Sequence, residues 1–383
     1  MADPPRARRW PWFLAAFAVL LGLGAWWVGR QLEPHRLTAL VLENAGDALD
    51  LELTIEGTPE YALRPEPRLV LPNLVARQRG AAVPLLRAAR AEFSLPWDTL
   101  QGSESVVITR IELQRPVLDL AALAAWRATR PEVPFRMPTL TEGLRLTDGS
   151  LLGDGWAVTA LALDLPGLRP DTPARARLSG RFEQAATVLE FDASLALATA
   201  SLVSGLGIQA SGRLRSGDID VPYALDIQGH LDAAGETIAL EVAALTLTSE
   251  SPLPNLSAAG SARFGERMQL QLQGELPQWP AGWPALPEPL SASASPLAYV
   301  LAYAGPLDFG APLSLQLVRD ETRLDSTLAL PAMLAWLDQD NASLLPPLQG
   351  RLETPRLVVN GVTLEGVRVI VEEDAPSATG PLP

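Results

Sequence analysis

Residues that carry out chemistry in proteins are scarce in this chain of 383 residues. It has no cysteine and only two histidines, His35 and His230. All 30 basic residues are arginine, so no lysine is present for a Schiff base or for a phosphate-binding loop. The lack of cysteine excludes thiolate metal sites and cysteine nucleophiles, and two histidines leave little material for a zinc or copper site.

The remaining catalytic residue types do not form a recognisable arrangement. Neither histidine lies near a Gly-x-Ser-x-Gly elbow, which a serine hydrolase of that type would need. Asp218 and Asp220 follow a glycine, but they lack the spaced ligands of a calcium loop and favour a turn. We therefore expect no enzymatic activity, no cofactor and no metal. The carboxylates considered as a catalytic pair all lie on the polar sides of alternating stretches, where charge serves solubility: Asp164, Glu190, Asp192 and Asp226.

Charge and composition exclude two further classes. The net charge is −14, and an acidic body does not suit nucleic acid, whose phosphates need a basic face. The hydrophobic share is 48%, which supplies enough apolar surface for a folded chain and excludes a disordered one.

An uncharged apolar run extends from Trp10 to Val28. At ~1.5 Å per residue it spans ~28 Å, close to the hydrocarbon thickness of a bilayer. Arg6, Arg8 and Arg9 precede it, and the positive-inside rule places that end in the cytoplasm. A cleaved signal peptide is the alternative, but the run is longer than a usual signal core. We predict an uncleaved transmembrane helix, with interfacial indole rings at its two ends from Trp10, Trp12, Trp26 and Trp27.

From residue 50 onward, apolar and polar residues alternate with period two, the pattern of strands with one buried face. The clearest stretches are 188–197, 268–273 and 323–330. One-sided strands of this kind are typical of antiparallel sheet. Other expected strands lie around Ile111 and Leu113, Leu225 and Ile227, 238–242, 313–317, 357–359, 362–364 and 367–371.

Turns and short helices separate the strands. Helical spacing predicts helices over 35–44, 119–129 and 331–340. The proline-rich stretch 277–289 predicts a loop, whose Trp279 and Trp283 we expect to pack locally rather than to contact a membrane. Turns are predicted at Asp148–Gly149, Asp154–Gly155, 216–218, Asn360–Gly361 and Glu365–Gly366.

The predicted fold class is therefore mainly β. It has an N-terminal transmembrane helix followed by a long, curved, mostly antiparallel sheet of 14–18 strands, gutter-like or sandwich-like, with a few short helices. A sheet of that width must curl or split, and its apolar face needs a cover. We divide the chain into a cytoplasmic N-terminus (1–9), the transmembrane helix (10–28), an N-terminal β region with short helices (31–130), a repetitive antiparallel β region (131–374) and a flexible tail (375–383).

Residues 34–120 carry the most specific pattern. A strand ends at Gly57, a proline-marked strand covers 65–73, and a third strand ends in a tail formed by Leu95, Leu100 and Gly102. The final strand reads Ile-x-Leu-x-x-Pro-x-Leu-x-Leu over 111–120. This stretch resembles the N-terminal part of the AsmA family of inner-membrane-anchored periplasmic proteins. The chain departs from that family in being short and in having Pro84 and Pro96, which we expect to interrupt the third strand. Type II secretion protein N is a more distant resemblance.

The resemblance implies a bacterial inner-membrane protein with a periplasmic body, similar to bridge-type lipid-transfer proteins. Its expected function is to hold or pass phospholipid or another envelope lipid along an apolar β groove during outer-membrane biogenesis, without catalysis. The alternative is an anchored assembly or secretion-complex component that binds other envelope proteins. The groove candidates are the apolar residues of three alternating stretches: Leu189, Phe191, Leu195, Leu270, Leu272, Leu315 and Leu317.

Overall fold

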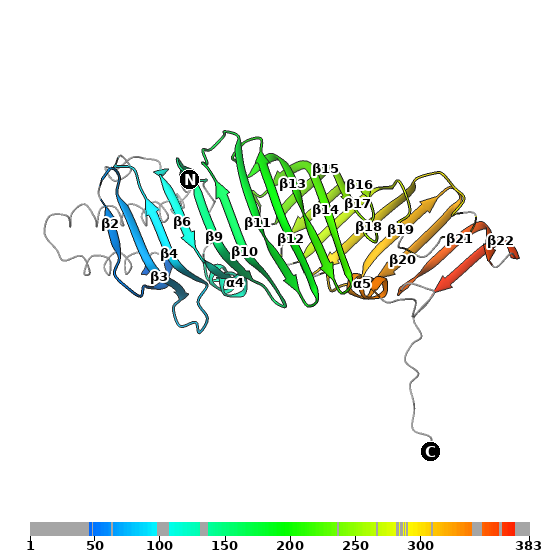
Figure 1. The fold of residues 1–383 in the computed structure, drawn as a ribbon, viewed down its shortest axis with the longest axis horizontal. Helices are drawn as coiled ribbons and strands as arrows, with labels where there is room; N and C mark the ends of the chain where they lie inside the picture. The colour runs from blue at the N-terminus through cyan, green and yellow to red at the C-terminus, as the bar shows by residue number, and fades with distance from the viewer. Residues whose placement is uncertain are drawn as a thin grey trace, which may run out of the picture. The chain divides into compact units, whose positions relative to one another are not determined.

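The computed structural model describes residues 46–47, 49–62, 64–97, 107–130, 137–235, 237–265, 267–280, 283, 286, 288, 290–307, 309–338, 347–359 and 362–371. The chain divides into two compact units between Leu206 and Gly207, within strand β13 (Val203–Ser216). Each unit consists mainly of β-strands (Figure 1), which confirms the predicted fold class at that level. The predicted transmembrane helix, the helix over 35–44 and the tail lie outside the described residues.

The first unit is a mixed sheet. Its strands are β1 (Leu51–Thr54), β2 (Glu60–Ala62), β3 (Arg68–Gln78), β4 (Leu86–Ser94), β5 (Val107–Ile108), β6 (Arg110–Gln114), β7 (Val117–Asp119), β8 (Thr139–Leu140), β9 (Leu144–Leu152), β10 (Trp156–Leu165), β11 (Ala174–Gln184) and β12 (Thr187–Leu197). Most neighbours are antiparallel, but β9 runs parallel to β6 and β7, and the small β5–β8 pair is also parallel.

Helix α4 (Leu120–Ala128) belongs to the crossover that the parallel pairing of β7 and β9 requires. Asp119 caps it, since its carboxylate accepts a 2.8 Å hydrogen bond from the Ala122 amide. Leu123 and Trp126 pack against a cluster around Leu51, and the Trp126 indole donates to the Leu49 carbonyl at 2.9 Å. The predicted helix over 119–129 is confirmed.

The second unit is an antiparallel meander, in which consecutive strands from β14 to β22 pair with each other. Beyond β13 it contains β14 (Ile219–Asp232), β15 (Ile238–Ser249), β16 (Leu256–Phe264), β17 (Met268–Leu276), β18 (Leu297–Gly305), β19 (Leu313–Arg319), β20 (Thr322–Leu328), β21 (Leu348–Val359) and β22 (Val362–Val371). Helix α5 (Leu330–Asp338) follows β20 and confirms the predicted helix over 331–340.

Several local predictions were wrong. The described residues hold 22 strands rather than 14–18. Asp148–Gly149 lies inside β9, where a positive φ of 53° at Asp148 accompanies a register shift against β10, so the pair forms a bulge and not a turn. Gly366 likewise lies inside β22 with φ of 62°. Pro84 and Pro96 flank β4 and do not interrupt it, and β20 ends at Leu328.

Candidate functional site

Apolar side chains form continuous rows across the strands of the second unit. In an antiparallel sheet, directly opposed residues point to the same face, so a row of opposed apolar residues makes one apolar face. At ~4.8 Å per strand step, a row over eight strands extends ~34 Å. The first row, from β14 to β21, is Leu231, Leu240, Ala262, Leu270, Tyr303, Leu313, Leu328 and Leu348.

Two further rows lie beside the first one on the same face. One has apolar side chains separated by three glycines and by Ser326, and it is Gly229, Val242, Gly260, Leu272, Leu301, Leu315, Ser326 and Gly350. The other is Ile227, Leu245, Ala258, Gly274, Tyr299, Leu317, Leu324 and Leu352. We call these three rows the apolar face of the second unit.

Four of the predicted groove residues come together on this face. Leu272 and Leu315 both lie opposite Leu301, while Leu270 lies opposite Tyr303 and Leu317 lies opposite Tyr299. All four predicted residues are half-buried, so part of each side chain remains open to solvent. The intervening residues of β17, which are Gln269, Gln271 and Gln273, are opposed by residues of the other face.

The two tyrosines of β18 anchor the apolar face, and the sequence analysis missed them. Tyr299 and Tyr303 are 7% and 3% exposed. The Tyr299 hydroxyl donates to the Ser257 carbonyl at 2.9 Å, and the Tyr303 hydroxyl donates to the Pro306 carbonyl at 2.6 Å. Burial raises the pKa of Tyr299, so the hydroxyl stays protonated as a donor. The alternation Leu297, Tyr299, Leu301, Tyr303 was the signal available in the sequence.

Two segments cover parts of the apolar face. Leu330 and Met333 of α5 pack against the cluster formed by Met268, Tyr303, Leu313 and Leu328. Trp279 packs against the cluster that includes Tyr299, and its ring meets Trp283 edge-on at 4.8 Å between centroids. The expectation that these tryptophans pack locally is therefore confirmed.

The other three predicted groove residues lie in the first unit, on β12. Leu189, Phe191 and Leu195 are half-buried and share one face of that strand, opposite Phe182, Gly180 and Ala176 of β11. The rows of this unit are also apolar. One is Leu71, Ala91, Leu113, Leu146, Leu163, Leu178 and Ala193, and the next is Leu53, Ala76, Leu86, Leu118, Leu151, Val158, Phe182 and Leu189.

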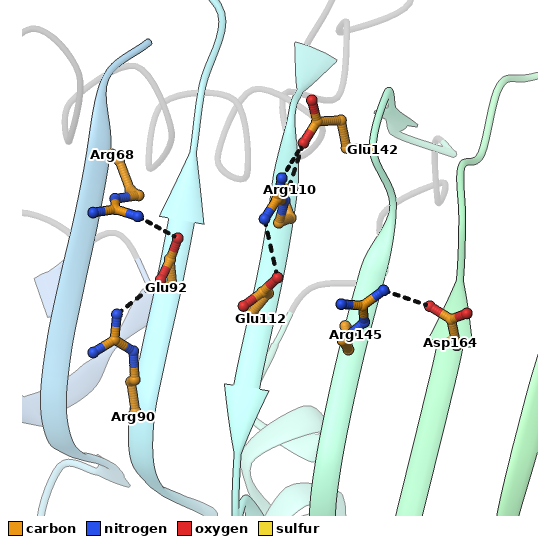
Figure 2. Close-up of polar contacts among 8 residues, drawn as sticks. All are labelled: Arg68, Arg90, Glu92, Arg110, Glu112, Glu142, Arg145 and Asp164. Carbon is orange, nitrogen blue, oxygen red and sulfur yellow. Dashed lines mark hydrogen bonds and ion pairs between the residues drawn. The ribbon is translucent and has the colours of Figure 1, made fainter. Parts of the chain in front are cut away.

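The opposite face of the first unit carries a band of paired charges (Figure 2). Glu92 is 6% exposed and binds two arginines, Arg68 at 3.4 Å and Arg90 at 3.0 Å. It lies directly opposite Glu112 on β6, an arrangement of like charges that is unfavourable alone. Arg110 binds Glu112 at 3.2 Å and thereby offsets that repulsion.

The charged band continues across β9 and β10. Arg110 also donates through Nε to Glu142 at 3.0 Å, and this hydrogen bond raises the pKa of the arginine. Arg145, which is opposite Glu112, binds Asp164 at 3.5 Å. Each charge drawn in Figure 2 therefore has a partner of opposite sign, and most of these ion pairs link neighbouring strands.

The carboxylates considered earlier do not converge. Glu190 binds Arg181 at 3.1 Å, and Asp226 accepts from Gln209 at 3.0 Å. Asp220 accepts from Arg213 at 2.9 Å, at the end of the predicted 216–218 turn. His230 is exposed on β14, opposite Glu241.

Two further features concern the described part of the chain alone. No group of three or more His, Cys, Asp or Glu side chains there could hold a metal ion. No helix there is long and apolar enough to cross a bilayer, and the predicted anchor with Trp10, Trp12, Trp26 and Trp27 lies outside that part. Comparison of the chain with protein-family models, with curated proteins and with solved structures found no match.

Proposed function

We propose that this chain is a non-enzymatic lipid-handling protein of the bacterial envelope, anchored in the inner membrane and acting in outer-membrane biogenesis. The sheet would serve as a gutter along which phospholipid acyl chains are held or passed. The observation that carries the proposal is the apolar face of the second unit, on which Leu270, Leu272, Leu315 and Leu317 lie in neighbouring rows and are only partly buried.

The physical basis is the cost of exposing hydrocarbon to water, about 0.8 kcal/mol for each CH₂ group. The four partly buried leucines still expose hydrocarbon to water, and an acyl chain laid along them would remove both apolar surfaces from water. Movement along the row would break no directional bond, because the leucines offer none. Recognition of this kind needs no catalytic residue.

The resemblance of residues 34–120 to the AsmA family supports the location in the proposal. It implies an inner-membrane anchor and a periplasmic body. The acidic body and the lack of cysteine are compatible with that compartment, where unpaired thiols would oxidise.

The test is a charge placed on the apolar face of the full-length protein, purified from bacterial envelopes in mild detergent. Leu270→Glu and Leu315→Glu should lose co-purifying phospholipid in native mass spectrometry while circular dichroism stays unchanged. Gln271→Glu is the matched control, because this exposed neighbour on β17 lies on the opposite face. It should keep the lipid.

Two results would count against lipid handling. If Leu270→Glu unfolds the sheet, the leucine belongs to a closed core and not to a gutter. If the wild-type protein is free of lipid and bound stoichiometrically to another envelope protein, the same face is a docking surface. The chain would then be an assembly or secretion-complex component.

A further inference from the structure

Strand β22 is the most exposed apolar element in the described part of the chain. Its ten residues pair with β21 alone, and eight of them are exposed. Val362 and Ile370 are each 59% exposed, Leu364 is 45% exposed and Val369 is 38% exposed. Figure 1 shows β22 as the last strand of the second unit.

The edge of β22 that faces away from β21 is suited to pairing with another strand. A strand paired on one side presents a row of unpaired amide and carbonyl groups on the other side. Natural edges are usually protected by proline, lysine, short length or inward charges. β22 has no proline or lysine, and its two charged residues, Glu365 and Arg368, cancel. By contrast, β1 and β2 pair only with β3 and are four and three residues long.

The sequence of β22 is complementary to itself. In antiparallel pairing of two identical strands about a two-fold axis, two opposed residues must point their backbone groups the same way, either both toward the other copy or both away from it. Their residue numbers therefore add to an even number. With Val367 on the axis, Val367 meets Val367 of the second copy. Leu364 meets Ile370 twice, and Thr363 meets Val371 twice.

This register has no conflict of charge or space. Glu365 lies opposite Val369 and Arg368 lies opposite Gly366, so like charges never face each other. Gly366 has a φ of 62°, and a Cβ built at this position has no neighbour within 4 Å. That space is open for the aliphatic part of Arg368 from the second copy. A register centred on Gly366 would instead place two positive-φ residues against each other.

We propose that two copies of this chain associate by antiparallel pairing of β22 with β22, with Val367 at the two-fold axis. The two-fold axis is perpendicular to the plane of the joined sheet. Rotation about it keeps each face on its own side, so the apolar faces of the two second units lie on the same side. This interface is independent of the proposed function, because backbone hydrogen bonds and exposed β22 side chains form it whether or not lipid binds.

The lack of cysteine allows a direct test of the register. Val367→Cys in the full chain introduces a single thiol, and its two copies would be directly opposed, within the Cα separation that a disulfide needs. Mild oxidation should convert most of the protein to a covalent dimer. Val318→Cys is the control, because Val318 is 40% exposed but lies on β19 between β18 and β20. It should stay largely uncrosslinked.

A double variant and its control test the interface without cross-linking. Leu364→Lys combined with Ile370→Lys adds positive charges to exposed positions, so the fold should persist while the dimer dissociates at least tenfold more readily in analytical ultracentrifugation. Val318→Lys should leave the dimer intact. A wild-type chain that is monomeric at tens of micromolar would overturn the proposal. So would a dimer that Val367→Cys fails to link or that the double lysine variant leaves unchanged.

Discussion

Strands β3 and β4 and strands β17 to β19 both contribute apolar side chains to a packed cluster, but the burial of their leucines differs. In the first region, Leu71 is 1% exposed and Ala91 is 0% exposed, within a cluster completed by Leu74 and Ala88. In the second region, Leu270, Leu272, Leu315 and Leu317 are half-buried. Alternation therefore identifies which face of a strand is apolar, while only tertiary packing decides whether that face is a closed core or an open surface.

The largest expected effect is on the closed region. Leu71→Ala should lower the free energy of unfolding by about 2–5 kcal/mol, since it leaves a cavity in a packed core. Leu272→Ala should cost less than half as much, because its side chain is already partly in water. Urea unfolding followed by circular dichroism measures both, with separate midpoints if the two units unfold separately. Equal losses would show that the two regions are packed alike.

A second prediction compares a buried ion pair with an exposed ion pair in the charged band. Glu92→Gln removes a buried carboxylate from Arg68 and Arg90 and should cost about 1–3 kcal/mol. Asp164→Asn breaks a pair whose two side chains are 59% and 48% exposed, and it should cost about 0–1 kcal/mol. Thermal unfolding of the two variants gives the comparison. A larger loss at Asp164 would contradict it.

A third prediction opens a covered part of the apolar face. Met333→Ala truncates the α5 side chain that packs near Tyr303 and should cost about 1 kcal/mol. It should also increase the binding of an environment-sensitive dye, because more of the face becomes accessible. Gln316→Ala, on the opposite side of β19 from Leu315, is the control. Unchanged dye binding by Met333→Ala would mean that α5 does not limit access.

The smallest expected effect is a pH dependence at the β21–β22 pair. Hydrogen bonding by Arg351, then by Arg368, holds the pKa of Glu353 below its usual value of 4.5. A lowered pKa in the folded state stabilises the pair above the unfolded pKa, and that contribution is lost as pH falls through the folded pKa. As the pH falls below 4.5, amide exchange in β22 should therefore accelerate more in the wild type than in Glu353→Gln. A Glu353→Gln profile identical to wild type would exclude this contribution.

Much of the strand pattern could be predicted from the sequence. The stretches 188–197 and 268–273 lie in β12 and β17, and both described helices were expected. Predictions failed where glycine was taken to mark a turn. A positive φ occurs at the β9 bulge and at Gly366 within β22, as well as at tight turns, so the dipeptides at 148–149 and 365–366 did not by themselves identify a turn.

The predicted site residues lie on the expected face of their strands, but their neighbours on adjacent strands could not be predicted from the sequence. Period two places Leu270 and Leu272 on one side of β17. It does not reveal that Leu301 of β18 lies between Leu272 and Leu315, because strand pairing is non-local. The same limit applies to the burial of Glu92, which depends on strand pairing and has no signal in the sequence.

The meander of the second unit has a consequence for how it opens. From β15 to β21 each strand is held by its two neighbours along the chain, whereas β22 is held by one. Such a quasi-one-dimensional arrangement makes stability a sum of nearest-neighbour terms. Local unfolding should begin at β22 and advance strand by strand, so amide protection should rise from the C-terminal strand toward the interior. Pairing of β22 with β22 of a second copy would remove this gradient of amide protection, because no strand at that end of the sheet would then have an unpaired edge.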